Sequence, residues 1–347
     1  MINIIFKLST ILLSINNIVS SFNPLKQFCS FVTPNSDSVY FYLYTKNIEN
    51  IAIKPDIESI KNAPFTNGSD TLNVVVHGFG SSSQMRNIIA VRRAYLNGTV
   101  ERNVIMVDYS KVTGQVSSSN IVTYGIEYLQ AVYCDLPIIS KAIANIIEII
   151  LNTRSEIKKV HCVGHSLGSH ICGEMGNLFK KNGNKIYRIT ALDPAEPLFK
   201  LSPKITNQCA NFVDVYHTNI GHKGFTNPLG TIDFYINNAV IQPGCVKDRS
   251  YDKSLDCSHR SALLYFAKSV NDDNIMASPC PDIINIVADK RCQYLKIDDN
   301  SKNDLNNICI IKSKQLTKND VAFGEHVPYN ASGIYFLEME ELPSSGL

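Results

Sequence analysis

Short runs of apolar and β-branched residues recur through the middle of the chain and predict a series of strands. The runs span Leu72–Val76, Val104–Val107, Val160–Val163, Ile186–Leu192 and Phe212–His217. The first two lack polar alternation, which is typical of strands that are buried on both faces of a sheet. A sheet with such strands needs a layer of helices on each side.

Helical spacing separates several of these strands. Residues Met85–Leu96 are compatible with a helix, and the apolar residues between Ile138 and Ile150 fall on one broad helical face. Asp135, followed by Pro137, is expected to cap the second of these helices. Because strands alternate with helices as in βαβ units, the pattern predicts an α/β fold with a mostly parallel central sheet.

The flanking regions are less regular. Val39–Tyr44 alternates with aromatic residues and predicts an antiparallel strand at one edge of the sheet, whereas Lys46–Gly68 is polar and loop-like. From Cys245 onward the chain is rich in loops, with a helix expected near Arg260–Val270 and a last strand at Ile334–Met339. The absence of internal repeats and of a Gly-rich linker in the sequence favours one domain.

The N-terminus has the layout of a secretory signal peptide. A single lysine precedes the apolar stretch Leu8–Ile15, and the small residues Ser20 and Ser21 follow it. An uncleaved membrane anchor is the alternative, but the apolar core is short for a transmembrane helix. We therefore expect residues 1–21 to be removed and residues 22–347 to form the folded domain, without a transmembrane anchor.

Composition agrees with an extracellular protein. Ten cysteines fit an oxidising compartment, and the net charge of +2 provides no general attraction to nucleic acid. Sequons at Asn67, Asn97 and Asn330 are candidate glycosylation sites. We expect a secreted glycoprotein that acts without a nucleic-acid partner.

The segment Lys159–His170 predicts a strand, a sharp turn and a helix, and it contains the candidate nucleophile. In G-H-S-L-G, Ser166 stands between Gly164 and Gly168, which is typical of a strained turn that projects a serine hydroxyl above a sheet. The alternative is a glycine-bracketed serine in an ordinary turn, because so short a motif also occurs by chance. The rest of the chain has to supply its chemical partners.

A serine nucleophile needs a base and a carboxylate that orients the base, and α/β-hydrolases carry them after the serine in the order Asp or Glu, then His. Asp193 ends the strand Ile186–Leu192 and is the candidate carboxylate, with an Asp-Pro turn as the alternative. His259 is the preferred base because it follows Cys257 and is expected to open a helix. His326 is the alternative base.

Hydrolysis of an ester also needs donors aimed at the developing oxyanion. The backbone N–H of Leu167, directly after the nucleophile, is one candidate. The second is the N–H of Phe79 in the motif H-G-F-G that follows the strand Leu72–Val76. Here the alternative interpretation is a tight exit from the strand.

Taken together, these stretches resemble the pancreatic-lipase family, in order along nearly the whole chain after the signal peptide. The motifs that carry the resemblance are V-V-V-H-G-F, N-V-I-M-V-D-Y-S, G-H-S-L-G-S-H, A-L-D-P-A-E-P-L-F, F-V-D-V-Y-H-T, Q-P-G-C and C-S-H-R-S. The resemblance implies an α/β-hydrolase fold and assigns the catalytic roles to Ser166, Asp193 and His259, with Phe79 and Leu167 as oxyanion donors. Within the family, the chain is most similar to the secreted phospholipase A1 branch of arthropods, including venom enzymes.

The resemblance also carries expectations about domains, metals and disulfides. A separate C-terminal β-sandwich domain is not expected, and residues 200–211 contain no Asp or Glu where larger relatives bind calcium, so we predict neither metal nor cofactor. It implies the disulfides Cys245–Cys257 and Cys280–Cys292. Cys162 and Cys172 are expected to be buried thiols. The partners of the remaining cysteines stay open: Cys29, Cys134, Cys209 and Cys309.

The predicted function is release of the sn-1 fatty acid from glycerophospholipids through an acyl-enzyme, by a monomer acting at a membrane or micelle surface. Six of the eleven residues in Val246–Asp256 are charged, so this segment lacks the apolar face of a long lipase lid, and phospholipid is preferred over triacylglycerol. The alternatives are a triacylglycerol lipase and a non-catalytic lipid-binding protein like the yolk proteins of this family. Yolk proteins usually lack the nucleophile.

Overall fold

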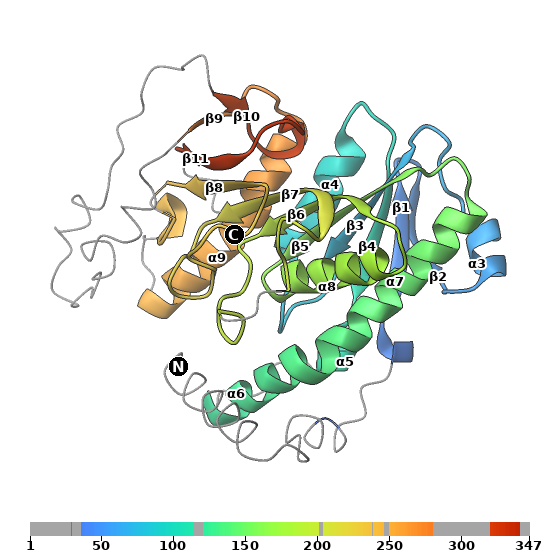
Figure 1. Cartoon of the computed structure of the whole chain (residues 1–347), viewed down its shortest axis with the longest axis horizontal. Coiled ribbons are helices and arrows are strands. Elements are labelled where there is room, and N and C mark those ends of the chain that lie inside the picture. Colours follow the sequence, from blue (N-terminus) through green and yellow to red (C-terminus); the bar gives the residue numbers. More distant parts are fainter. Residues whose placement is uncertain are drawn as a thin grey trace, which may run out of the picture.

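The computed structural model describes residue 29 and residues 36–113, 121–200, 204–237, 239–245, 250–279 and 320–340. Across this part of the chain, eleven strands form one sheet in the order β10-β9-β11-β8-β7-β6-β5-β3-β4-β1-β2 (Figure 1). The strands are β1 (Tyr40–Thr45), β2 (Ile48–Ile53), β3 (Thr71–Val76), β4 (Asn103–Asp108), β5 (Lys159–His165), β6 (Ile186–Leu192), β7 (Ala210–His217), β8 (Ile232–Ile236), β9 (Met276–Pro279), β10 (Val321–Ala322) and β11 (Gly333–Leu337).

The centre of the sheet is parallel and its two ends are antiparallel. Every neighbouring pair from β11 to β4 runs parallel. At one end β1 pairs antiparallel with β4 and β2, and at the other β9 pairs antiparallel with β11 and β10. The predicted α/β fold with a mostly parallel sheet is therefore confirmed.

Helices cover both faces of this sheet, as predicted. The helices are α3 (Ile57–Asn62), α4 (Arg86–Asn97), α5 (Ser110–Thr113), α6 (Ile121–Gln130), α7 (Leu136–Thr153), α8 (Leu167–Lys181) and α9 (Tyr251–Ser269). Val74 and Val76 belong to an apolar core shared with α3, α6, α7 and α8, whereas Val75 belongs to a second core shared with α4 and α9. Alternate residues of one strand thus feed opposite cores, which explains its continuous apolar run.

Two predictions at the N-terminal edge were wrong. β1 does not form the edge, because β2 lies outside it within the segment predicted to be a loop. In β2 only Ile53 is buried. The strand is held by its pairing with β1 rather than by burial, so it leaves little apolar pattern in the sequence. β8, which lies inside the sheet, was not predicted either.

Asp135 does not cap a helix. The backbone continues from α6 through a π-helical turn, η2 (Ala131–Asp135), straight into α7, and Asp135 has helical angles with no side-chain capping bond. Pro137 follows in the first turn of α7. Proline has no N–H to donate to the preceding turn. The wider π-helical turn therefore lets the helix continue through this point without a break.

Helix α9 begins earlier than predicted, at Tyr251 rather than near Arg260, so His259 lies inside the helix and does not open it. Ser250, with extended backbone angles, precedes the first turn. The turns before Leu255 are polar and largely exposed, which hides the helical period from the sequence. Part of the charged segment between the two cysteines is therefore helical, while residues 246–249 lie outside the described residues.

Three disulfides join described cysteines. Cys245 is bonded to Cys257, the pair that the resemblance implied, and Cys29 is bonded to Cys134. The prediction that Cys162 and Cys172 are buried thiols was wrong, because they form a buried disulfide with a Cα–Cα distance of 6.1 Å. The sharp turn folds α8 back against β5, and this brings the two cysteines together. Cys209 is free and buried. Cys280, Cys292 and Cys309 lie outside the described residues.

Several other predictions concern regions that the structure does not test. The predicted signal peptide at residues 1–21 lies outside the described residues. Within the described stretches, no helix combines the length and the apolarity that crossing a bilayer requires. Asn67, Asn97 and Asn330 are all exposed, and their glycosylation stays a prediction.

Candidate active site

Ser166 occupies the sharp turn between β5 and α8. Its φ of 55° and ψ of −119° lie in a region that non-glycine residues rarely adopt. A Cβ at Gly164 would lie 2.4 Å from the carbonyl oxygen of Gly168, and a Cβ at Gly168 would lie 2.4 Å from the carbonyl oxygen of His77. Both glycines are therefore required by close backbone packing, and the turn that they allow carries Ser166 into a cavity.

Asp193 and His259 are in direct contact. Nδ1 of His259 lies 2.5 Å from Oδ2 of Asp193, and the Asp193 side chain is fully buried. The other carboxylate oxygen accepts hydrogen bonds from the backbone N–H groups of Thr218 at 2.8 Å and Asn219 at 3.1 Å. Gly224 packs so closely that a Cβ there would lie 2.4 Å from this oxygen. The carboxylate is held from three sides and presents its remaining oxygen to the imidazole.

The backbone around His259 is also fixed. The Cys245–Cys257 disulfide ends two residues before it, and the hydroxyl of Ser258 accepts a hydrogen bond from the backbone N–H of Gln242 at 2.9 Å. On the other side, Nε2–H of buried His165 donates to the carbonyl oxygen of His259 at 3.0 Å. Burial, together with the neighbouring His259, lowers the pKa of His165 well below its usual value, so His165 serves as a neutral donor.

The H-G-F-G turn packs directly against the serine. A Cβ at Gly78 would lie 3.0 Å from Cβ of Ser166. Among the described residues, the N–H groups of Phe79 and Leu167 have no hydrogen-bond partner. Phe79 follows Gly78, which packs against Ser166, and Leu167 directly follows Ser166. They are therefore suitably placed to be donors for a charge that develops on a bound substrate.

His77 supports this turn from beneath. Its ring stacks on Tyr109 with 3.9 Å between centroids, Nε2 accepts from the N–H of Tyr109 at 3.2 Å, and Nδ1–H donates to the carbonyl oxygen of Gly78 at 2.8 Å. Burial lowers the pKa of His77 to about 4, despite the opposing effects of that hydrogen bond and of Asp108. The neutral ring thus has one defined tautomer, and it fixes the carbonyl next to Phe79.

A cavity of about 430 Å³ opens at these residues. Ser166 and His259 both line it, together with the turn Gly78–Ser81 and two tyrosines of α6, Tyr124 and Tyr128. The ring of Phe79 meets both tyrosines edge-on, with centroids 5.4 and 5.2 Å apart. Met85, Ile88, Leu255 and Leu263 add to the apolar lining, and four charged residues also face the space: Lys223, Asp252, Asp256 and Arg260.

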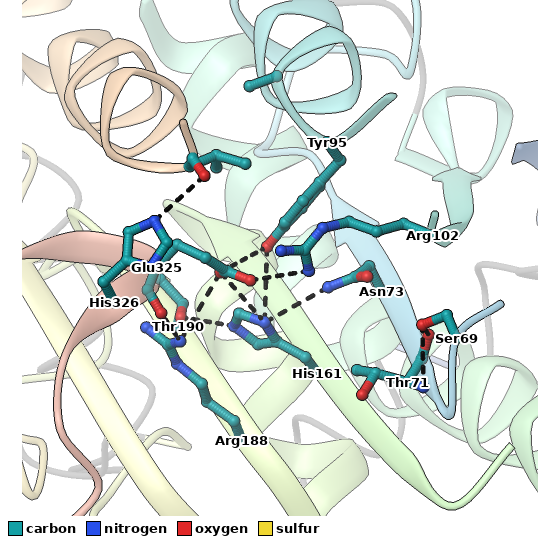
Figure 2. Close-up of polar contacts among 12 residues, drawn as sticks. Ser69, Thr71, Asn73, Tyr95, Arg102, His161, Arg188, Thr190, Glu325 and His326 are labelled. Carbon is teal, nitrogen blue, oxygen red and sulfur yellow. Dashed lines mark hydrogen bonds and ion pairs between the residues drawn. The ribbon is translucent and has the colours of Figure 1, made fainter. Parts of the chain in front are cut away.

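The other histidines after Asp193 have different surroundings. His326 lies in the short helix η5 (Gly324–His326), where its Nε2 is 3.3 Å from the carbonyl oxygen of Val270 (Figure 2). His217 is buried between the carbonyl oxygen of Phe225 and the carboxylate of Asp233. Of the four histidines after Asp193, only His259 contacts the Asp193 carboxylate within the described part of the chain.

Several residues of the cavity were missed from the sequence. Tyr124 and Tyr128 are four residues apart, a helical spacing that marks one face, but nothing local connects that face with Ser166. Arg260 could have been predicted from the sequence, because it directly follows the preferred base His259. As for metals, the described residues contain no group of three or more His, Cys, Asp or Glu side chains that could hold an ion.

Comparisons with known proteins find similarity to lipases and phospholipases. The model of the Lipase family matches residues 23–293. Pancreatic lipase-related protein 2 of Cavia porcellus is 29% identical over 284 residues, which cover 75% of this chain and 58% of the relative. Phospholipase A1 of Vespa velutina is 30% identical over 249 residues, covering 68% and 78%. Lipase member H-B of Xenopus laevis is 38% identical over 147 residues, covering 41% and 31%.

The chain thus spans less than two thirds of the length of the pancreatic and Xenopus relatives, and more of the Vespa protein. The match of the Lipase family covers most of the sequence, including the turn at Ser166, Asp193 and His259. This chain therefore belongs to the lipase family.

Proposed function

We propose that this protein is a secreted carboxylic-ester hydrolase that releases the sn-1 fatty acid of glycerophospholipids, a phospholipase A1. The observation that carries the proposal is the pairing of His259 with the buried carboxylate of Asp193, at a cavity that Ser166 also lines. This set of groups is the one that converts a weak serine nucleophile into a reactive one. Its members are far apart in the sequence.

In the proposed mechanism, Nε2 of His259 takes the hydroxyl proton of Ser166 while the serine oxygen attacks the ester carbonyl carbon. Asp193 holds the Nδ1–H tautomer and stabilises the imidazolium that forms. The carbonyl oxygen becomes an oxyanion, which the N–H groups of Phe79 and Leu167 stabilise. The tetrahedral intermediate then expels the glycerol oxygen, and His259 returns its proton to that oxygen.

An acyl-serine remains after the lysophospholipid leaves. His259 takes a proton from a water molecule, which attacks the acyl carbon through a second tetrahedral intermediate. Ser166 departs and recovers a proton from His259, so the free fatty acid and the starting enzyme are regenerated. Each proton that His259 accepts is returned within the cycle, and no metal or cofactor is needed.

The preference for phospholipid is supported by the cavity and by relatives. Two of the relatives are named phospholipase A1, from Vespa tropica and Vespa velutina. Charged side chains of α9 face the cavity, so a polar head group finds hydrated partners there. Secretion and the monomeric state belong to the proposal as well, and the three disulfides support secretion.

A triacylglycerol lipase is the second candidate. The apolar wall formed by Phe79, Tyr124 and Tyr128 favours it, because such a surface also accommodates additional acyl chains. Relatives named pancreatic triacylglycerol lipase, from Sus scrofa and Homo sapiens, are each 29% identical. A non-catalytic lipid-binding protein would have no use for a strained serine in the same cavity as an oriented imidazole.

The direct test uses a phosphatidylcholine with different acyl chains at sn-1 and sn-2. The proposal expects release of the sn-1 acid by the wild-type protein, and loss of release in a folded Ser166→Ala variant. Rates on phosphatidylcholine vesicles and on emulsified triolein at matched interfacial area distinguish the two candidates. A higher rate on triolein, with a jump as the emulsion forms, would favour the triacylglycerol lipase.

A further inference from the structure

Three charged side chains form a connected group at the cavity. Asp256 and Arg260 lie one turn apart on α9, and Lys223 follows β7 in a loop. Nζ of Lys223 lies 2.5 Å from Oδ1 of Asp256, while Nη2 of Arg260 donates to the other oxygen of the same carboxylate. All three residues line the cavity that contains Ser166 and His259. We call Lys223 and Arg260 the cation pair, and Asp256 the bridging aspartate.

The bridging aspartate holds the two cations without using up their donors. Burial raises the pKa of Asp256, but the charges of Lys223 and Arg260 outweigh burial and lower it, so the carboxylate is ionised at neutral pH. The group carries a formal charge of +1. A guanidinium has five N–H donors and an ammonium three, and the contacts with Asp256 occupy a minority of them.

Solvent reaches all three side chains. The side chains of Lys223, Asp256 and Arg260 are 41%, 34% and 43% exposed. An exposed ion pair contributes little to stability, because water screens it and its side chains lose conformational freedom. The same exposure leaves the free donors of Arg260 and Lys223 accessible to a ligand that enters the cavity. Asp252, the other charged residue in the lining, lies at the exposed start of α9.

Both cations are neighbours of the proposed catalytic groups. Arg260 directly follows His259 on α9. Lys223 directly precedes Gly224, which packs against the carboxylate of Asp193. In a glycerophospholipid, only the three-carbon glycerol unit separates the sn-1 ester from the phosphodiester. A substrate whose ester carbonyl lies at Ser166 can therefore place its phosphate within the cavity that both cations also line.

We propose that Arg260 and Lys223 bind the phosphodiester of the substrate and so determine the preference for phospholipids over neutral glycerides. This inference rests on the proposed phospholipase function and names the side chains behind its specificity. A guanidinium is well suited to the role, because its planar donors match two phosphate oxygens. Asp256 acts as a positioning residue that keeps both cations at the cavity.

The test compares two substrates that differ only at the head group. Acid release from a phosphatidylcholine and from a 1,2-diacylglycerol with the same acyl chains is measured in the same nonionic mixed micelles. For Arg260→Gln, we expect the ratio of kcat/KM on phosphatidylcholine to kcat/KM on diacylglycerol to fall about tenfold or more, as for loss of a hydrogen bond to a charged group. Lys223→Gln should lower the same ratio, and Arg260→Lys should restore part of it.

Arg93→Gln is the matched control, because Arg93 is an exposed arginine on α4 and does not line the cavity. Its ratio should equal that of the wild type. Thermal unfolding of each variant accompanies the kinetics. If the Arg260 and Lys223 variants lose stability and lose rate equally on both substrates, the group is only a structural tie and the inference is overturned.

Failure of the inference is distinguishable from failure of the proposed function. If the wild type cleaves phosphatidylcholine but the two variants keep the wild-type ratio, the phosphodiester is bound elsewhere and only the inference fails. If the wild type cleaves diacylglycerol and leaves phosphatidylcholine intact, the phospholipase proposal itself fails. In that case the cation pair has no phospholipid to recognise.

Discussion

Two groups of polar residues are built around strands β5 and β6, and they differ in what surrounds them. At the carboxyl ends, Ser166 and His259 line a cavity, and the buried carboxylate of Asp193 contacts His259. Nearer the amino ends lies a second group, which we call the buried ionic cluster. It contains Tyr95, Arg102, His161, Arg188, Asp214 and Glu325.

In the buried ionic cluster, the charges are satisfied by protein atoms. Arg188 binds both oxygens of Asp214, at 2.9 and 2.8 Å, and its other donors reach the backbone carbonyls of Gly324 and Glu325. The carboxylate of Glu325 lies 2.9 Å from Arg102 and also accepts from the hydroxyl of Tyr95 (Figure 2). None of the six cluster residues lines the cavity at Ser166.

The comparison shows which property separates a chemical site from a structural one. Both groups contain a buried histidine near a carboxylate, so burial and pairing do not distinguish them. The candidate site differs because Ser166 and His259 face a cavity, and because the N–H groups of Phe79 and Leu167 have no partner in the described part of the chain. Four predictions test this distinction, from the largest expected effect to the smallest.

The largest effect is expected for the two histidines that compete as the base. His259→Ala should lower esterase activity by several orders of magnitude, since the members of a triad act as a unit. His326→Ala, beside the buried ionic cluster, should leave kcat/KM close to the wild-type value. Initial rates on a soluble short-chain ester provide the measurement. The reverse result would show that the base is misassigned.

Breaking the buried ionic cluster should affect stability rather than chemistry. Arg188→Met removes the cation that binds Asp214 and one of the two arginines near Glu325. Leaving a buried charge without its partner costs about 3–5 kcal/mol. Urea unfolding measures the loss, with Arg93→Gln as the exposed control. A loss below about 1 kcal/mol would mean that Asp214 becomes protonated or hydrated at little cost.

The Cys245–Cys257 disulfide should contribute to both stability and activity. It closes a loop with a sequence separation of 12, which is worth about 3 kcal/mol in the chain-entropy model. Because the bridge ends two residues before His259, the Cys245→Ala/Cys257→Ala variant should also lose activity under conditions where it remains folded. Unchanged activity in the folded variant would contradict a role in positioning the base.

The smallest effect concerns the pH dependence of stability. Burial, together with Arg188 and Arg102, lowers the pKa of His161 well below its usual value. Between the lowered folded-state pKa and the ordinary value near 6.5, the unfolded state binds more protons, so stability falls as pH falls through this range. His161→Gln should flatten this loss by about 1.4 kcal/mol per pH unit. Urea unfolding at pH 7 and pH 5 compares the two proteins, and parallel slopes would contradict the prediction.

The sequence predicted those parts of the fold whose signal is local. The strands before Gly78, Ser166 and Asp193 were placed within a residue or two, because burial on both faces produces continuous apolar runs. Strand β2 and the first turns of α9 were missed because pairing or solvent exposure, rather than burial, determines their composition.

The candidate site was predictable to the extent that chain order restricts it. Ser166, Asp193 and His259 each follow a recognisable pattern. Their order along the chain restricted the candidates, and the family resemblance assigned the roles. Tyr124 and Lys223 carry no such pattern, since only the folding of α6 and of the loop after β7 brings them to the cavity. The Cys162–Cys172 disulfide was missed for the same reason, because the return of α8 onto β5 is a tertiary event.

The position of Glu325 late in the chain has a consequence for biosynthesis. A nascent chain synthesised as far as residue 319 already contains Arg188, Arg102 and Tyr95, but it lacks the carboxylate and the two backbone carbonyls that complete their contacts. It also lacks β11, the parallel partner of β8. The sheet therefore cannot be completed while the ribosome still holds these residues, and premature termination before Glu325 would leave Arg102 without its carboxylate and Arg188 with fewer hydrogen-bond acceptors.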